Sequence, residues 1–231
     1  MRRRLAGLLI LWALPVGAEC RLALALAVDV SRSVDAADFV IQTEGLADAL
    51  ADRDVQAAIF GPEGVVALSI YQWSGAGHQE VIQPWVLLEQ PEVLDGVIWA
   101  VRRAGRPERR QATALGEALR FGAGLMAEAP PCARQVIDVA GDGRNNEGLS
   151  VSSIYRRVDF GDITVNALAI GEHEQGVARY FLDEVIRGPG AFVEIAPQQV
   201  DYPPAIRRKL LRELEGPQIG MALPKAPGGK T

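Results

Sequence analysis

Apolar and polar positions along this chain follow two patterns in alternation. Short, nearly continuous apolar runs are typical of strands buried on both faces, and between them lie segments whose apolar residues recur every three or four positions, as in amphipathic helices. The runs predict strands over residues 22–28, 65–73, 81–88, 134–140, 163–170 and 191–195. The other segments predict helices from Asp35 or Asp38 through Leu50 and over residues 54–60, 91–101, 113–125, 151–158, 177–186 and 203–214.

This order of elements predicts an α/β fold, with a mostly parallel central sheet flanked by helices on both faces. Pro84 has no amide hydrogen to give to a neighbouring strand, so strand 81–88 is expected at an edge of the sheet. Ligands of such sheets bind at the carboxyl ends of the strands. The polar residues that follow each strand are therefore the first candidates for a functional site.

The two ends of the chain differ from its middle. Three arginines and an apolar run ending in Gly17-Ala18 predict that residues 1–18 are a secretory signal peptide. Residues 19–215 are long enough for one domain with a full core, and residues 216–231, rich in Pro and Gly, are predicted to be a disordered tail. The mature protein is expected to be exported, either to the periplasm or out of the cell.

Charge and hydropathy narrow the possible partners. The chain has a formal net charge of −5, and loss of the signal peptide removes three arginines and leaves it more acidic. An acidic chain without a basic, aromatic-rich cluster is a poor nucleic-acid binder. After residue 18 no apolar segment is long enough to span a bilayer, so no integral membrane segment is expected in the mature chain. Cys20 follows Glu19 instead of a small residue, which argues against lipidation.

The mature chain has two cysteines, Cys20 and Cys132. Exported proteins are found in oxidising compartments, where disulfides form. Cys20 precedes Asp29 by nine residues and Cys132 precedes Asp142 by ten, each before a strand-like run. If those strands are parallel neighbours, the cysteines lie side by side, so a disulfide is expected. The alternative is two buried or unpaired thiols.

The most distinctive polar pattern is Asp29, Ser31 and Ser33, directly after strand 22–28. Residues two apart in an extended segment face the same way, so one carboxylate and two hydroxyls can converge at the end of the strand. Such oxygens suit Mg²⁺, Ca²⁺ or Mn²⁺ and not a thiophilic metal. The alternative is a polar turn in which Ser31 or Asp35 caps the next helix.

Three elements, in this order, resemble the von Willebrand factor type A (vWA) domain. Asp29-x-Ser31-x-Ser33 resembles the first signature of the family, and Thr113, at the head of a predicted helix, resembles the second. Asp142-Gly143, after a later strand, resembles the third. The resemblance covers about residues 20–200 and implies the Rossmann-like vWA fold with its metal-ion-dependent adhesion site (MIDAS).

The resemblance also implies a role for each position. Ser31, Ser33 and Thr113 correspond to hydroxyl ligands, with Thr113 bound directly or through water. Asp29 and Asp142 correspond to carboxylates that hold coordinated waters. The ion, Mg²⁺ first of all with Ca²⁺ or Mn²⁺ as alternatives, would then accept an acidic side chain of a partner protein. A helix cap at Thr113 and a turn at Asp142 are the alternatives.

The chain departs from the family pattern at Gly141, where the family often has Thr. Glycine has no side chain to support the loop. Gly143 and Asn145 are candidates to position the metal ligands without binding the ion themselves. The run Asn145-Asn146-Glu147 adds oxygen donors that either belong to the site or form a solvated loop.

The N-terminal signal, Tyr71-Gln72-Trp73-Ser74 and the segment 207–211 further resemble a bacterial group of exported single-domain vWA-like proteins of unassigned function. The leading expectation is therefore an exported module that binds a divalent cation and mediates metal-dependent protein–protein interaction. A metal-free structural or interaction domain that keeps the same motif is the second possibility.

A hydrolase is the third possibility. Ser31 or Ser33 as nucleophile would need a histidine as base, and the only histidines, His78 and His173, lie in hydrophilic loops. The chain is therefore not expected to be an enzyme. The acidic neighbours of His173 are a minor alternative metal site, and the basic loop 102–110 is either solvated or docks an acidic partner.

Overall fold

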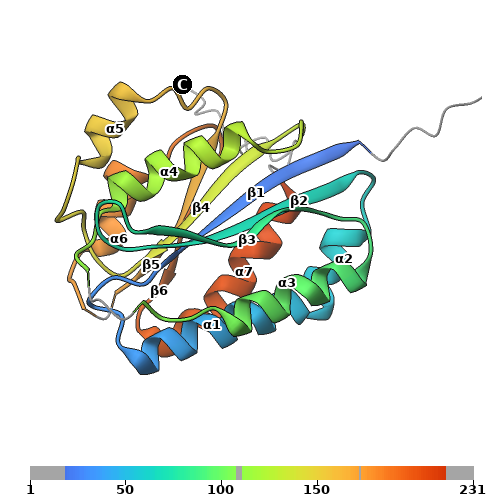
Figure 1. Cartoon of the computed structure of the whole chain (residues 1–231), viewed down its shortest axis with the longest axis horizontal. Helices are drawn as coiled ribbons and strands as arrows, with labels where there is room; N and C mark the ends of the chain where they lie inside the picture. Colours follow the sequence, from blue (N-terminus) through green and yellow to red (C-terminus); the bar gives the residue numbers. More distant parts are fainter. Residues whose placement is uncertain (1–18, 108–110, 172, 217–231) are drawn as a thin grey trace, which may run out of the picture.

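One sheet of six strands forms the centre of the part of the chain that the structure, a computed structural model, describes (Figure 1). The described residues are 19–107, 111–171 and 173–216. The strands lie in the order β3-β2-β1-β4-β5-β6, and only β2 and β3 pair antiparallel. Their bounds are β1 Cys20–Asp29, β2 Val65–Trp73, β3 Gln79–Leu88, β4 Gln135–Gly141, β5 Thr164–Ile170 and β6 Val193–Ala196.

Helices cover both faces of the sheet. On one face lie α1, α2, α3 and α7, and on the other lie α4, α5 and α6 (Figure 1). Their bounds are α1 Ala36–Ala51, α2 Arg53–Phe60, α3 Pro91–Arg103, α4 Leu115–Ala127, α5 Val151–Arg157, α6 Val177–Tyr180 and α7 Tyr202–Glu215. The fold expected from the sequence, a mostly parallel sheet between two helical layers, is confirmed.

The central strand β1 explains why both faces are covered. Its leucines at 22, 24 and 26 point into the core under α1 and α7, and its alanines at 23, 25 and 27 point into the core under α4. The small alanine face lets α4 approach closely. A Cβ at Gly122 of α4 would lie 2.6 Å from the Tyr71 hydroxyl, which itself donates to the Ala118 carbonyl oxygen at 2.9 Å.

Two details differ from the predicted elements. Residues 177–186 divide into α6 and the π-helical turn η1, Phe181–Val185, because the Ile186 amide bonds to the Phe181 carbonyl five residues back (3.1 Å). A 3₁₀ turn, η2 Gln199–Asp201, precedes α7. The edge position of β3, inferred from Pro84, is confirmed, and β3 is also the antiparallel strand.

A buried ionic cluster attaches α7 to the sheet. The fully buried Lys209 ammonium lies 2.5 Å from Asp138 Oδ1 on β4 and 2.7 Å from Glu213 Oε1, one turn further along α7. Asn166 on β5 donates to the same Glu213 oxygen at 3.0 Å. Burial, and then the charge of Glu213, raise the pKa of Asp138 well above its ordinary value. Two carboxyl groups thus share one buried cation.

The expected disulfide is present: Cys20 at the start of β1 is bonded to Cys132 just before β4. The two strands are parallel neighbours, as the spacing argument required. Within the described ranges no helix is long and apolar enough to cross a membrane. The predicted signal peptide, and the predicted tail from residue 217 on, lie outside the described residues.

Candidate metal site

The predicted site residues meet at the carboxyl edge of the sheet. β1 ends at Asp29, and its neighbour β4 ends at Gly141, directly before Asp142. The register Ala27↔Val139 places these two strand ends side by side. Thr113 comes from the loop just before α4. Parallel pairing of β1 and β4 therefore brings together residues that are more than a hundred positions apart.

A chain of short contacts joins all five predicted ligands. Asp29 Oδ1 accepts a hydrogen bond from the Ser31 amide at 2.7 Å. The Ser31 hydroxyl lies 3.4 Å from Thr113 Oγ1 and 3.2 Å from Ser33 Oγ. Ser33 Oγ in turn donates to Asp142 Oδ1 at 2.6 Å. Three hydroxyls and two carboxylates thus surround one small space.

The two carboxylates are incompletely satisfied. Asp29 is 0% exposed and Asp142 1% exposed, and in each the Oδ2 atom is buried without a hydrogen-bond partner among the described residues. Burial raises the pKa of Asp29 well above its ordinary value, and the nearby Asp142 charge raises it further. Burial also raises the pKa of Asp142. A cation between them would remove both penalties.

The donor set fits a hard divalent cation. Its ligands would be two carboxylates and three hydroxyls, all oxygen, which suits Mg²⁺, Mn²⁺ or Ca²⁺. The described residues contain no group of three or more His, Cys, Asp or Glu side chains arranged to hold a metal ion. Glu172, one of the two acidic neighbours of His173, lies outside the described residues, so the alternative metal site at His173 stays a prediction.

Thr113 is not the helix cap that was weighed as an alternative. The N-cap of α4 is Ala114, whose side chain caps nothing. Asn145 takes that role from the loop after β4, since its Oδ1 accepts from the Gly116 amide at 2.8 Å. Asn146 Oδ1 accepts from the Thr113 amide, also at 2.8 Å. The Thr113 hydroxyl is therefore left to face Ser31.

These contacts decide between the two interpretations of the loop 145–147. Asn145 and Asn146 hold α4 and Thr113, and Glu147 Oε2 accepts from the Ala76 amide at 3.2 Å. The loop is a support for the site and not simply a solvated turn. Asn145 was expected individually to support the ligands, and Asn146 only as one of the oxygen donors of the run 145–147.

Gly141, the departure from the vWA pattern, has a steric cause. A Cβ at this position would lie 3.2 Å from Asp29 Oδ2 and 3.3 Å from both Trp73 Cζ2 and Phe181 Cζ. The two rings, from β2 and from η1, fill the space that a threonine side chain would need. Both rings are fully buried and support the floor of the site.

Two residues from the loop after β5 also reach this edge. Glu174 accepts from the Arg144 amide at 2.8 Å and pairs with the Arg144 side chain at 2.9 Å, which fixes the loop that follows Asp142. His173 Nε2 lies 3.5 Å from Asp38 Oδ2. Among the described residues, neither His78 nor His173 hydrogen-bonds to Ser31 or Ser33. In the sequence, the one indication that Glu174 and His173 lie near the site was their position in a loop that follows a strand.

The basic loop is described in part. Arg106 donates to the Val34 carbonyl at 2.7 Å and so holds the segment between the serines and α1. Arg109 and Arg110 lie outside the described residues. Arg106 therefore supports the site loop, and docking of an acidic partner on this loop stays a prediction.

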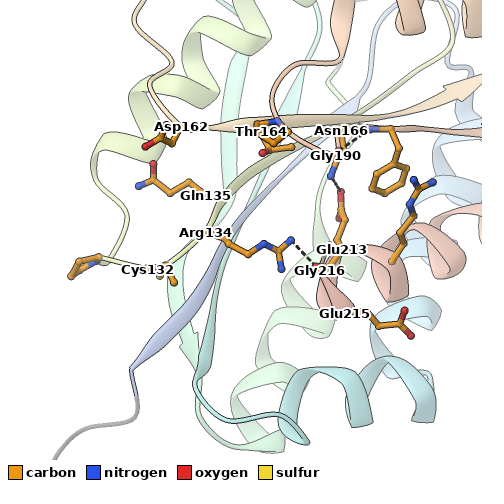
Figure 2. Close-up of a pocket in the computed structure, with 15 residues that line it drawn as sticks. Cys132, Arg134, Gln135, Asp162, Thr164, Asn166, Gly190, Glu213, Glu215 and Gly216 are labelled. Atoms are coloured by element: carbon orange, nitrogen blue, oxygen red, sulfur yellow. Dashed lines mark hydrogen bonds between the residues drawn. The ribbon is translucent and has the colours of Figure 1, made fainter. Parts of the chain in front are cut away.

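A cavity of about 970 Å³ lies at the opposite, amino edge of the sheet (Figure 2). Its polar side chains bind one another: Arg134 donates to the Glu213 carbonyl at 3.1 Å, and Asn166 donates to the Glu213 carboxylate at 3.0 Å. The Arg212 guanidinium stacks on Phe192 at 3.7 Å. The cavity wall is therefore part of the set of contacts that attaches α7 to the sheet. It lies far from the five predicted ligands.

Comparison with known proteins covers most of the chain. The family described as "Protein of unknown function (DUF1194)" matches residues 19–218. No curated protein matches the chain. The solved structures that resemble it include one whose name gives a MIDAS motif and one whose name gives von Willebrand factor type A, both at 14% sequence identity, so they establish the fold alone.

Three of these structures illustrate the likeness. Proximal thread matrix protein 1 of the mussel byssus, solved with a zinc-occupied MIDAS motif, is 14% identical with a TM-score of 0.62, covering 86% of this chain and 49% of that one. The von Willebrand factor type A protein of Catenulispora acidiphila is 14% identical with a TM-score of 0.60, covering 84% and 43%. BatB of Bacteroides thetaiotaomicron is 14% identical with a TM-score of 0.57, covering 84% and 98%. The chain thus spans about half of the mussel protein.

Proposed function

The chain belongs to the DUF1194 family of proteins of unknown function and has a vWA-like fold, and from its site we propose that it binds a divalent cation and, through that ion, an acidic side chain of a partner protein. Mg²⁺ is the first candidate for the ion, with Mn²⁺ and Ca²⁺ next. The ligands are Asp29, Ser31, Ser33, Thr113 and Asp142. The place of action is outside the cytoplasm, in the periplasm or beyond the cell, which the predicted signal peptide and the disulfide support.

The observation that carries the proposal is the pair of buried, unpartnered carboxylate oxygens. Leaving a buried charged oxygen without a partner costs more than leaving a neutral one. Asp29 Oδ2 and Asp142 Oδ2 are both buried without a hydrogen-bond partner among the described residues, on either side of three hydroxyls. A divalent ion accounts for all five side chains at once, whereas a purely structural role explains the hydrogen bonds but not the two orphaned oxygens.

The proposed partner chemistry follows from the charge of the ligands. Asp29 and Asp142, if they hold the ion through coordinated waters, leave much of its positive charge at the open position, and the three hydroxyls add no negative charge. Such a site keeps affinity for another hard anionic oxygen, and the carboxylate of Asp or Glu is the usual protein source. The zinc-occupied MIDAS motif of the mussel protein supports metal binding here without indicating which ion this chain prefers.

Binding is favoured over catalysis by the surroundings of the serines. A nucleophilic serine needs a base within hydrogen-bond reach. In the described residues the neighbours of Ser31 and Ser33 are other hydroxyls and the carboxylate of Asp142. Those contacts suit coordination of an ion, and among the described residues no histidine hydrogen-bonds to either serine.

The test is calorimetric titration of the oxidised protein, residues 19–231, with Mg²⁺, Mn²⁺ and Ca²⁺. We expect saturable binding at one site, lost in Asp29→Ala. Asp48→Asn, which removes an exposed carboxylate on α1 that pairs with Arg102, serves as the matched control and keeps the wild-type affinity. Equal ion affinity in Asp29→Ala and wild type, or no binding of any of the three ions, contradicts the proposal.

A further inference from the structure

An exposed arginine lies at the rim of the candidate metal site. Arg144 follows the predicted ligand Asp142 by two positions, and its side chain is 51% exposed. Its amide donates to Glu174 Oε2 at 2.8 Å. A Cβ at Gly143 would lie 3.5 Å from that same Glu174 oxygen and 3.8 Å from the Thr113 hydroxyl. Arg144 and the carboxylate that holds it therefore lie directly beside the predicted ligands.

The guanidinium of Arg144 is held in place from three sides. Its Nε lies 2.9 Å from Glu174 Oε1. Its Cζ lies 5.7 Å from the centre of the Tyr180 ring on α6, which is within the range of a cation–π contact. A Cβ at Gly176, the N-cap of α6, would lie 3.2 Å from Arg144 Nη2. An arginine that is already held in this way loses less side-chain freedom when it binds a ligand.

The outer end of this guanidinium has unused hydrogen-bond donors. Nη1 and Nη2 carry all but one of the N–H groups of an arginine side chain. Among the described residues, neither nitrogen of Arg144 makes a hydrogen bond. A planar guanidinium with both of these groups open binds a carboxylate through two parallel hydrogen bonds. The rim of the metal site thus offers a place for a carboxylate next to the ion.

We propose that Arg144 binds a second acidic side chain of the partner protein, within three residues of the one that reaches the ion. The inference rests on the proposed function, since the ion fixes where the first carboxylate lies. The short separation follows from the position of Arg144 beside the ligands, because an extended chain advances only about 3.3 Å per residue. Glu174 is a positioning residue, since it holds Arg144 and does not touch the partner.

Other groups of a partner fit this rim less well. A Lys or Arg would have to pair with Glu174, but Arg144 already engages both oxygens of that carboxylate. A neutral carbonyl or carboxamide oxygen can accept from Nη1 or Nη2, but hydrogen bonds between charged groups are about twice as strong. The arrangement therefore selects for a negative residue at this place of the partner.

The test is a displayed library of heptapeptides with Asp fixed at the centre and the other six positions randomised. Peptides are selected on the oxidised protein, residues 19–231, with Mg²⁺ and, in parallel, with EDTA. We expect Asp or Glu to be enriched several-fold at one fixed distance from the central Asp, in the Mg²⁺ selection alone. Replacing that second acid by Asn or Gln in a selected peptide should weaken its binding about fivefold, the loss expected for a well-placed surface ion pair.

Variants of the protein assign the preference to Arg144. Arg144→Met removes the guanidinium and keeps an unbranched side chain, so it should bind the acidic peptide and its amide variant equally well. Arg144→Lys keeps the charge without the two parallel donors and should retain only part of the difference. Arg179→Met is the matched control, because Arg179 is an exposed arginine paired with a carboxylate, Asp183 on η1, and not with the loop at the metal site. Each variant is first titrated with Mg²⁺ to show that the ion site is intact.

The outcomes separate the two proposals. Mg²⁺-dependent peptides without a second acid, or an acidic preference that is as strong in Arg144→Met or Arg144→Lys as in the wild type, overturn the inference and leave the proposed function standing. Failure to select any Mg²⁺-dependent peptide, with ion binding intact by calorimetry, overturns partner binding and the inference with it. Absence of ion binding in the wild type overturns the proposed function at its first step.

Discussion

Ser33 donates a hydrogen bond of 2.6 Å to Asp142, a residue 109 positions further along the chain. The bond joins the loop after β1 to the loop after β4 at the carboxyl edge of the sheet. It also fixes the distance between a hydroxyl and a carboxylate that the ion would share. The site therefore exists only when β1 and β4 are paired, which couples ion affinity to the stability of the sheet.

The first prediction concerns the cost of the site without its ion. Burial raises the pKa of both Asp29 and Asp142, and the charge of Asp142 raises the pKa of Asp29 further, so the ion-free protein pays for two buried carboxyl groups. Asp29→Asn is expected to raise the free energy of unfolding in EDTA by about 1 kcal/mol, the lower end of the cost of an unsatisfied buried polar group. With saturating ion the wild type becomes more stable than Asp29→Asn, because only the wild type is stabilised by ion binding.

Urea unfolding in EDTA and in excess ion measures both states. Asp48→Asn, on the exposed side of α1, is the control and should match wild type in each condition. A variant Asp29→Asn that is less stable than wild type in EDTA would show that the carboxylate is a structural group and not a strained ligand.

The second prediction concerns Gly141. Gly141→Thr, which restores the residue common in the vWA pattern, forces a side chain against Trp73 and Phe181. We expect a loss of stability of about 1–3 kcal/mol, as for other overpacked core sites, together with weaker ion binding. Adding Trp73→Phe removes one of the two ring atoms that lie 3.3 Å from the new Cβ and should restore part of both the stability and the ion affinity.

Urea unfolding and ion titration of the single and double variants provide the measurement. Gly96→Thr is the matched control, since a Cβ at Gly96 meets nothing within 4 Å. Equal losses in the single and double variants would mean that Trp73 does not set the requirement for glycine.

The third prediction concerns the anchor of α7. Lys209→Met removes the one cation between Asp138 and Glu213 and leaves two carboxyl groups facing each other in the core. Breaking a buried ion pair in this way costs about 3–5 kcal/mol. Urea unfolding of Lys209→Met should show that loss, and adding Glu213→Leu and Asp138→Leu should recover most of it. A loss below about 1 kcal/mol would contradict a structural role for the cluster.

The fourth prediction is a dependence on pH. The raised pKa of Asp138 means that the folded protein keeps this proton at pH values where the unfolded chain, near its ordinary pKa of 3.8, has released it. Asp138 therefore contributes its full stabilisation below the pKa of the unfolded state. This contribution is lost as the pH rises from there through the raised pKa of the folded state. Asp138→Asn has no proton to release, so its stability should fall less steeply between about pH 4 and pH 7.

Urea midpoints across that range, for wild type and Asp138→Asn, give the two slopes. Two parallel curves would show that Asp138 titrates alike in the folded and unfolded states. Asp48→Asn should reproduce the wild-type slope because Asp48 is exposed.

The order of helices and strands could be predicted from the sequence because the spacing of apolar residues agrees with the burial of each element in the structure. The apolar runs of β1 and β2 are buried on both faces, so each could be recognised without its neighbours. The convergence of Asp29 with Thr113 and Asp142 followed from the resemblance and from the rule that parallel strands end at one edge. The disulfide followed from the similar spacing, nine and ten residues, between each cysteine and the aspartate after the next strand.

The features that escaped prediction depend on contacts between distant segments. Gly141 needs the rings of Trp73 and Phe181, which belong to other elements. Nothing near Lys209 in the sequence indicates that it is fully buried, because its partner Asp138 lies 71 residues away on β4. The role of Asn146 depends on where the loop after β4 meets Thr113. Local patterns carry no information on such pairs.

The position of β1 has a consequence for how the chain is made. β1 is the first strand to emerge in synthesis, yet it lies in the middle of the sheet, and its partner β4 starts only at Gln135. Cys20 must likewise wait for Cys132, 112 positions later. During that interval the nascent protein presents an apolar strand and a reactive thiol to its surroundings. Formation of the correct disulfide therefore requires that oxidants and other chains be kept from Cys20 until Cys132 has been made.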